Sequence, residues 1–234
     1  QTGKESMSAT AVGFGDSRAA RFWNATIGKK IVMAASGAVL FLFVVAHLLG
    51  NLQVFLGAEH FNAYARLLRV EPALLWAARL GLLTMVVLHV WASFQLLLLN
   101  KMEARPVGYV KKKNIGSSYA SRTMYWSGPI IAAFVIYHLM QFTLGIGGTP
   151  FEEGKAYENL VAGFQVIPIS IFYLIAMAML MTHLFHGVWS AFQTLGVNHP
   201  RYTPMLRTLA KLIAIALFLG FASIPVGVMT GIVH

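Results

Sequence analysis

The chain has 234 residues, of which 57% are hydrophobic and only 11% are charged, and its mean hydropathy is +0.66. A soluble globular domain carries roughly a quarter of its residues as Asp, Glu, Lys and Arg, so this composition excludes a water-soluble fold. The net charge of +10 does not indicate nucleic-acid binding, because the basic clusters lie between apolar runs of membrane-spanning length. The sequence contains no cysteine, which excludes disulfides, thiolate metal sites and iron–sulfur clusters held by this chain.

Residues 1–30 are polar with no apolar stretch, and we expect them to form a cytoplasmic N-terminal tail. Residues 31–234 are predicted to form one transmembrane domain. A bilayer core about 30 Å thick needs about 20 apolar residues in a helix, because each residue rises about 1.5 Å. The predicted fold is therefore an all-α membrane protein whose five transmembrane helices form one bundle, and these helices cover residues 31–52, 73–99, 125–144, 166–192 and 206–232.

The connecting segments carry turn or charge signals and leave no room for a second soluble domain. In the first of them, residues 53–72, the apolar spacing from His60 to Leu68 predicts a short helix at the membrane interface. The other connections are predicted at residues 100–124, 145–165 and 193–205.

Basic residues orient the helices. Most Lys and Arg fall in the N-terminal tail and in segments 100–124 and 193–211, whereas most acidic residues fall in segments 53–72 and 145–165. By the positive-inside rule the N-terminus is cytoplasmic and the C-terminus lies outside the cell (inner) membrane. The cluster of Lys111, Lys112 and Lys113 suits contact with anionic lipid or with a cytoplasmic partner.

Five histidines lie inside four of the predicted spans, where an ionisable side chain costs a few kcal/mol and usually marks a pathway or a cofactor. Counted from the cytoplasmic edge, His47 and His138 lie about 24 and 20 Å into the membrane. Counted from the outer edge, His89 and His183 lie about 24 and 25 Å down. Four helices thus contribute two histidines at each of two levels, which is the requirement for two bis-histidine haems.

The fifth histidine, His186, lies one turn beyond His183 at the membrane edge, about 30 Å down. It is the alternative ligand of its helix, or a contact for a haem propionate. Pairings of His47 with His60 and of His186 with His199 on single helices are rejected, because a continuous helix would carry His60 to about 45 Å, beyond the hydrocarbon. A zinc site would need three or four ligands at one level, which these depths do not offer.

Several motifs of the sequence, taken together, indicate a known family. They are GKKIVMAASG at 28–37, AHLLGNL at 46–52, His89, the pair Tyr137-His138 and, most specific, HLFHGVWSAFQTLG at 183–196. From about residue 21 to the C-terminus the chain resembles the cytochrome b membrane anchor of succinate:quinone oxidoreductase, in the form that has one polypeptide with five helices and two haems.

The resemblance implies one axial histidine on each of the first four helices, with helix one paired to helix three (His47, His138) and helix two to helix four (His89, His183). It implies two haem b groups, a flavoprotein subunit and an iron–sulfur subunit as partners, and a quinone, usually menaquinone. Such a complex, a succinate dehydrogenase or fumarate reductase of the respiratory chain and tricarboxylic acid cycle, oxidises succinate to fumarate or does the reverse. Its oligomeric state is left open.

Two other functions compete with this interpretation. Di-haem anchors of other respiratory oxidoreductases concentrate their ligands on fewer helices. A proton-coupled transporter with intramembrane histidines would be colourless, whereas a haem protein is not.

We expect the quinone to react near the outer level, because a second haem displaced outward has little use if the quinone reacts beside the inner one. A quinone site needs a proton carrier within hydrogen-bond reach of a carbonyl oxygen. Of the polar residues in the first external segment, Glu59 and Glu71 are the expected carriers.

Overall fold

The computed structural model describes residues 18–99, 119–197 and 199–234. These residues contain helices and connections but no strand, as the composition predicts. The elements in chain order are α1 (Arg18–Asn24), α2 (Thr26–Asn51), the 3-10 helix η1 (Leu52–Leu56), α3 (Ala58–Leu67), α4 (Pro72–Leu98), α5 (Tyr119–Phe142), α6 (Ala156–Gln165), α7 (Ile167–Thr194) and α8 (Thr203–Met229).

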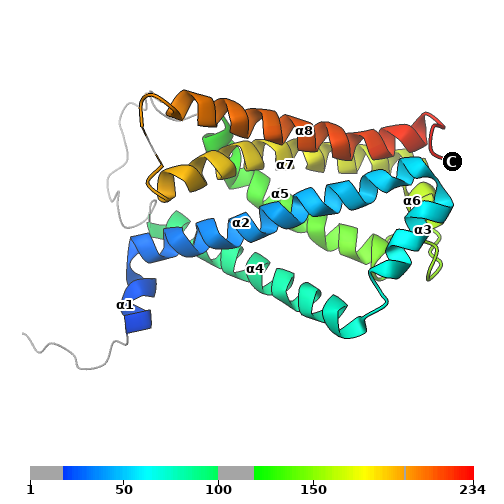
Figure 1. Ribbon diagram of the computed structural model, residues 1–234, viewed down its shortest axis with the longest axis horizontal. Helices are drawn as coiled ribbons and strands as arrows, with labels where there is room; N and C mark the ends of the chain where they lie inside the picture. Colours follow the sequence, from blue (N-terminus) through cyan, green and yellow to red (C-terminus); the bar gives the residue numbers. More distant parts are fainter. Residues whose placement is uncertain (1–17, 100–118, 198) are drawn as a thin grey trace, which may run out of the picture.

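The long helices form an elongated bundle (Figure 1). Helices α2, α5 and α8 run in one direction, and α4 and α7 run in the other. One end of the bundle holds η1, α3, α6 and the last residue, and the opposite end holds α1 and the turn between α7 and α8. We call these the α3–α6 end and the α1 end; by the charge pattern they correspond to the predicted outer and cytoplasmic sides.

Four helical segments among the described residues are long and apolar enough to cross a membrane: Thr26–Leu56, Pro72–Leu98, Ile167–Thr194 and Thr203–Met229. They match the first, second, fourth and fifth predicted spans. The predicted third span is occupied by α5, which lies in the bundle against α7 but does not meet the same measure of length and apolarity. Polar and weakly apolar residues within the span itself, among them Ser127, Pro129, His138 and Gln141, lower its hydropathy.

Two local predictions need correction: the beginning of the first span and the structure of segment 145–165. Helix α2 begins at Thr26 and not at residue 31, and α1 occupies part of the expected tail. The short helix predicted over residues 60–68 is confirmed as α3, Ala58–Leu67, and its place at a membrane interface stays a prediction. The segment 145–165, expected to be a plain connection, contains α6. The predicted lysine cluster at residues 111–113 lies outside the described residues.

Helix α6 forms because its apolar residues recur at helical spacing. Tyr157, Leu160, Val161 and Phe164 are all buried and lie on one face. That face packs against α3, α7 and α8 and helps to form the larger apolar cluster of the protein. The α3–α6 end is therefore closed by packed side chains, whereas α4 leaves large apolar residues such as Leu74, Leu80 and Leu83 exposed, as expected for a helix that faces lipid.

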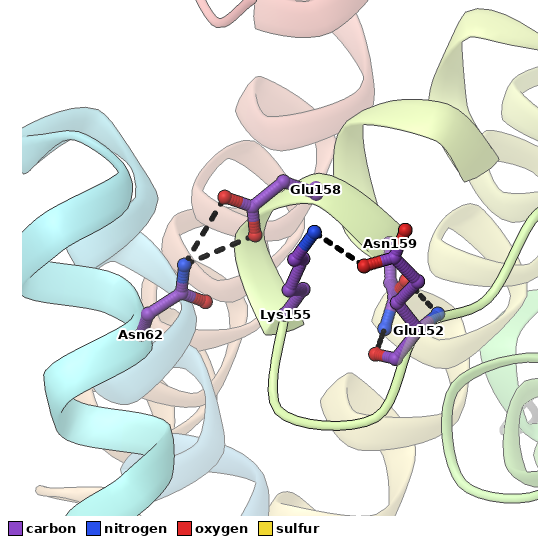
Figure 2. Close-up of polar contacts among 5 residues, drawn as sticks. All are labelled: Asn62, Glu152, Lys155, Glu158 and Asn159. Atoms are coloured by element: carbon purple, nitrogen blue, oxygen red, sulfur yellow. Dashed lines mark hydrogen bonds and ion pairs between the residues drawn. The ribbon is translucent and has the colours of Figure 1, made fainter.

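Asn62 of α3 joins the two short helices (Figure 2). Its Nδ2 donates to both carboxylate oxygens of Glu158, at 3.3 and 3.0 Å, and its Oδ1 accepts from the backbone N–H of Tyr157 at 2.9 Å. This satisfies an N–H group in the first turn of α6 that no residue of the helix itself can bind. The hydrogen bond from Asn62 is the main reason why the pKa of Glu158 lies below its ordinary value; a backbone hydrogen bond and the charge of Lys155 add to it.

A second set of contacts shapes the loop before α6. The backbone N–H of Glu152 donates to Asn159 Oδ1 at 2.8 Å, and Asn159 Nδ2 returns a bond to the carbonyl of Glu152 at 2.7 Å. Lys155 forms an ion pair with Glu152 (Figure 2), which raises the pKa of the lysine. The two short helices are thus fixed to each other and to the loop.

Candidate functional site

His47 of α2 and His138 of α5 face each other near the α3–α6 end. Their ring centroids are 5.8 Å apart and the rings are close to perpendicular, at 88°. Aromatic rings surround the pair: Phe43 stacks on His47 at 5.3 Å, and Phe134 and Phe142 lie 5.8 and 5.6 Å from His138. We call His47 and His138 the outer pair.

His89 of α4 and His183 of α7 form a second facing pair, with ring centroids 6.2 Å apart and an angle of 60°. Small residues surround it. A Cβ placed on Gly37 of α2 would lie 3.0 Å from Cε1 and 3.3 Å from Nδ1 of His89, so any larger residue would push against this ring. We call His89 and His183 the inner pair.

The two pairs lie at separate levels of the bundle. On α2, Gly37 contacts His89 of the inner pair, and the rise from Gly37 to His47 is about 15 Å. On α7, Tyr173 contacts His138 of the outer pair, and the rise from Tyr173 to His183 is again about 15 Å. Two independent helices thus give the same vertical separation.

The spacing within each pair fits coordination of one metal ion by two imidazoles. A metal–imidazole bond is about 2.0–2.1 Å and the nitrogen lies about 1.1 Å from the ring centre, so opposed ligands have centroids about 6.3 Å apart. The observed 5.8 and 6.2 Å are close to this value. No group of three or more His, Asp or Glu side chains suited to a metal occurs in the described ranges. A haem needs only two protein ligands, because the porphyrin supplies the other four.

The helix packing also fits a flat cofactor. Each histidine pair spans two helices, α2 with α5 and α4 with α7, whose backbones do not pack closely within the described part of the chain. Close packing instead joins α2 to α4, α5 to α7 and α7 to α8. The wider separation of α2 from α5 and of α4 from α7 therefore suits a haem held between the two imidazoles of each pair.

The Nδ1 atoms of three of these histidines lie beside oxygen atoms that can accept a hydrogen bond from Nδ1–H. His89 Nδ1 lies 3.1 Å from the carbonyl oxygen of Met33 and 3.3 Å from Ser36 Oγ, and His183 Nδ1 lies 3.4 Å from Ser127 Oγ. His138 Nδ1 lies 3.3 Å from the hydroxyl of Tyr173. A histidine that donates from Nδ1 keeps the lone pair of Nε2 for a metal, and such second partners are usual for metal-binding histidines.

His47 has a different neighbour. Asn51 Nδ2 lies 3.3 Å from its Nδ1 and donates to its backbone carbonyl at 2.7 Å, one turn along α2. The orientation of the imidazole is therefore supported from its own helix, whereas the other three are supported from neighbouring helices.

The remaining histidines lie apart from the two pairs. His186 is partly buried one turn beyond His183 and contacts no other histidine ring in the described part of the chain. His60 is exposed on α3, beyond a turn at Gly57, whose φ of 94° ends the helical path. His199 is exposed beyond the end of α7 and stacks on Tyr202 at 5.2 Å. The geometry agrees with rejecting the single-helix pairings, and the role of the four paired histidines as iron ligands stays a prediction.

Glu59 and Glu71 are both exposed at the α3–α6 end. A proton carrier for a quinone needs a place beside an apolar cavity, and the positions of these two carboxylates give that prediction no support. The same end contains an open pocket of about 350 Å³ that has a different carboxylate, Glu158, in its wall. Its lining residues are Ala58, Tyr157, Glu158, Val161, Ala162, Gln165 and His234.

The sequence interpretation missed the residues that support the histidines: Ser36, Asn51, Ser127, Gln141 and Tyr173. Most of them lie on a different helix from the ring they contact, so their spacing along the chain carries no signal. Glu158 was counted only as one acidic residue of an external segment. The helical period of α6 was the one available sign that this carboxylate belongs to a packed element.

Comparisons with known protein families, with characterised proteins and with solved structures find no match to this chain.

Proposed function

We propose that the chain is the di-haem cytochrome b anchor of a succinate:quinone oxidoreductase. The observation that carries the proposal is the two facing histidine pairs, with centroid separations of 5.8 and 6.2 Å, at levels about 15 Å apart along α2. The motifs at residues 28–37, 46–52 and 183–196 support the same family. In this proposal α5 also crosses the membrane, as the third of five spans, the α1 end is cytoplasmic, and the chain lies in the cell membrane.

The residues divide the work as follows. The imidazoles of His47 and His138 would hold the outer haem, and those of His89 and His183 the inner haem. Bound haem supplies one-electron transfer between an iron–sulfur subunit at the α1 end and a quinone. The aromatic side chains around the outer pair exclude water, and the acceptors at Nδ1 of His89, His138 and His183 keep these three rings in one orientation.

The distribution of the histidines favours this family over its alternatives. One histidine from each of four helices meets one partner, whereas anchors of other respiratory enzymes concentrate their ligands on fewer helices. A proton relay through the membrane would need titratable groups in continuous hydrogen-bond reach, and the two pairs are separated by about 15 Å.

The experiment is a redox assay on the complex purified through a tagged anchor. We expect a flavoprotein and an iron–sulfur protein to purify with the chain, succinate to reduce a pigment that absorbs as haem b, and a menaquinone analogue to reoxidise it. A colourless preparation would contradict the proposal. A coloured preparation that another respiratory donor, but not succinate, reduces would favour the anchor of a different oxidoreductase.

We also propose that the quinone reacts at the α3–α6 end, in the pocket beside Glu158. A volume of about 350 Å³ is at the lower end of the range of about 300–1,000 Å³ for small-molecule sites. The wall combines apolar residues, Val161 and Ala162, with the carboxylate of Glu158 and the amide of Gln165. This combination suits a ring with two carbonyl oxygens that must gain or lose protons.

Replacement of Glu158 by Gln should lower quinone turnover by about tenfold or more, because a positioned proton carrier typically contributes about 10²–10⁴-fold and water can partly replace an exposed one. Reduction of soluble dyes by succinate should persist. Glu59→Gln and Glu71→Gln are matched carboxylate changes on the same end. If one of these two variants loses quinone turnover while Glu158→Gln keeps it, the proton carrier is Glu59 or Glu71 and not Glu158.

A further inference from the structure

His138 is part of a chain of hydrogen bonds that runs away from the histidine pair. Its Nδ1 lies 3.3 Å from the hydroxyl of Tyr173, and that hydroxyl donates to Oε1 of Gln141 at 2.8 Å. A phenol has a single proton, which here goes to Gln141. The hydroxyl must therefore accept in its other contact, so His138 donates from Nδ1 and keeps the lone pair on Nε2.

Gln141 is held in place by two close contacts. It is 1% exposed, and a Cβ on Gly163 of α6 would lie 2.6 Å from its Nε2. A Cβ on Gly147 would lie 2.5 Å from its Cβ. The absence of side chains at these glycines lets α6 and the loop after α5 close over Gln141 and fix the direction of its amide.

The burial of Gln141 is not explained by stability. Its Nε2 is a buried donor without a hydrogen-bond partner in the described structure, and burial of such an unpaired group lowers the stability of the fold. An apolar side chain of similar length would fill the same space without this cost. The amide oxygen of Gln141 accepts the hydrogen bond from Tyr173, and this contact gives the buried amide a role.

We infer that Tyr173 and Gln141 are positioning residues for the outer haem: together they fix the tautomer of His138 and increase its basicity as an iron ligand. The inference rests on the proposed function. A hydrogen bond accepted from Nδ1–H makes the imidazole a stronger donor to iron and favours the oxidised metal. The Tyr173–Gln141 chain therefore lowers the reduction potential of the outer haem and leaves that of the inner haem unchanged, because His89 and His183 have other partners.

The test is a spectroelectrochemical titration of the purified complex. Tyr173→Phe keeps the ring and removes the hydroxyl. We expect both haems to stay bound and the outer haem to become easier to reduce, by about tenfold in the reduction equilibrium constant, which is about 59 mV for one electron. The inner haem should titrate as in the wild type.

Two further variants separate positioning from general damage. Tyr137→Phe is the matched control, because its hydroxyl donates to the carbonyl of Gly147 at 3.1 Å and belongs to the same aromatic cluster; its potentials should equal those of the wild type. Gln141→Met removes the acceptor at similar size and should shift the outer haem in the same direction as Tyr173→Phe, by less. Gln141→Glu keeps an acceptor oxygen, so the reduction potential of its outer haem should equal the wild-type value or lie below it.

The outcomes distinguish the inference from the proposed function. Two haems in the wild type, with unchanged potentials in both Tyr173→Phe and Gln141→Met, would overturn the inference and leave the proposed function standing. A lower outer potential in Tyr173→Phe would overturn it too, because it would mean that the tyrosine donates to His138. A wild-type protein without haem would refute the proposed function itself.

Discussion

The outer and inner pairs each consist of two facing histidines, but their surroundings differ. Phenylalanine rings and the Tyr173–Gln141 chain enclose the outer pair, and α3 and α6 close that end of the bundle. The inner pair lies against Gly37 and is supported by a backbone carbonyl and two serine hydroxyls. Large side chains thus shape the outer site, whereas the inner site depends on close helix contact.

The largest expected effect comes from the histidines themselves. Ala cannot donate a lone pair to iron, so His138→Ala should remove the outer haem only, and His183→Ala the inner haem only. His186→Ala should keep both. Haem quantitation and resolved redox titrations of the three variants measure this. If His186→Ala loses a haem while His183→Ala does not, the ligand on α7 has been assigned to the wrong residue.

Close helix contact at the inner pair can be tested at Gly37. Gly37→Val places carbon atoms where the His89 ring lies, because even a Cβ would be 3.0 Å from Cε1. We expect substantial loss of the inner haem with the outer haem retained. Gly81→Ala, on α4 with no heavy atom within 4 Å of the added Cβ, is the control and should retain both haems. Equal loss of both haems in Gly37→Val would show general unfolding instead of a local effect.

Much of this arrangement follows from the sequence, because a straight helix converts residue number into depth. That relation predicted which histidines meet, and the structure brings His47 to His138 and His89 to His183. It does not predict the rotation of each helix about its axis. The contacts of Tyr173 and Ser127 with these histidines depend on that rotation, so they could not be read from the spacing.

Local turn and charge signals explain where the expected helices differ from the structure. Helix α6 is hard to recognise in the sequence because the turn residues Gly147, Gly148 and Pro150 dominate its segment, although its buried residues follow a helical period. The charges of Lys29 and Lys30 make residue 31 the expected beginning of the first span, which is α2 in the structure. In the structure Lys29 is inside the helix and its Nζ donates to the carbonyl of Asn24 at 3.2 Å, which satisfies the charge locally.

The smallest expected effect concerns the contact between α3 and α6 beyond the outer pair. Asn62→Ala removes the hydrogen bonds to Glu158 and to the N–H of Tyr157 and should cost about 1–2 kcal/mol of stability, with both haems retained. Thermal denaturation in detergent measures this. Lys155→Met breaks only an exposed ion pair and should leave the melting temperature unchanged.

The same contact has a defined pH dependence. Asn62 holds the pKa of Glu158 below its ordinary value, so the interaction contributes stability above about pH 4.3 and the contribution is lost as the pH falls through the lower pKa of the folded state. The difference in melting temperature between wild type and Asn62→Ala should therefore shrink on acidification. A difference that grows on acidification would contradict this assignment.

The central claim is that this chain holds two haems, one at each histidine pair. The most direct measurement is the amount of haem b per polypeptide in the purified wild-type protein, combined with the low-spin electron paramagnetic resonance signals of bis-imidazole iron. We expect two haems per chain and two such signals. One haem per chain, none, or signals from iron with a single imidazole ligand would contradict it.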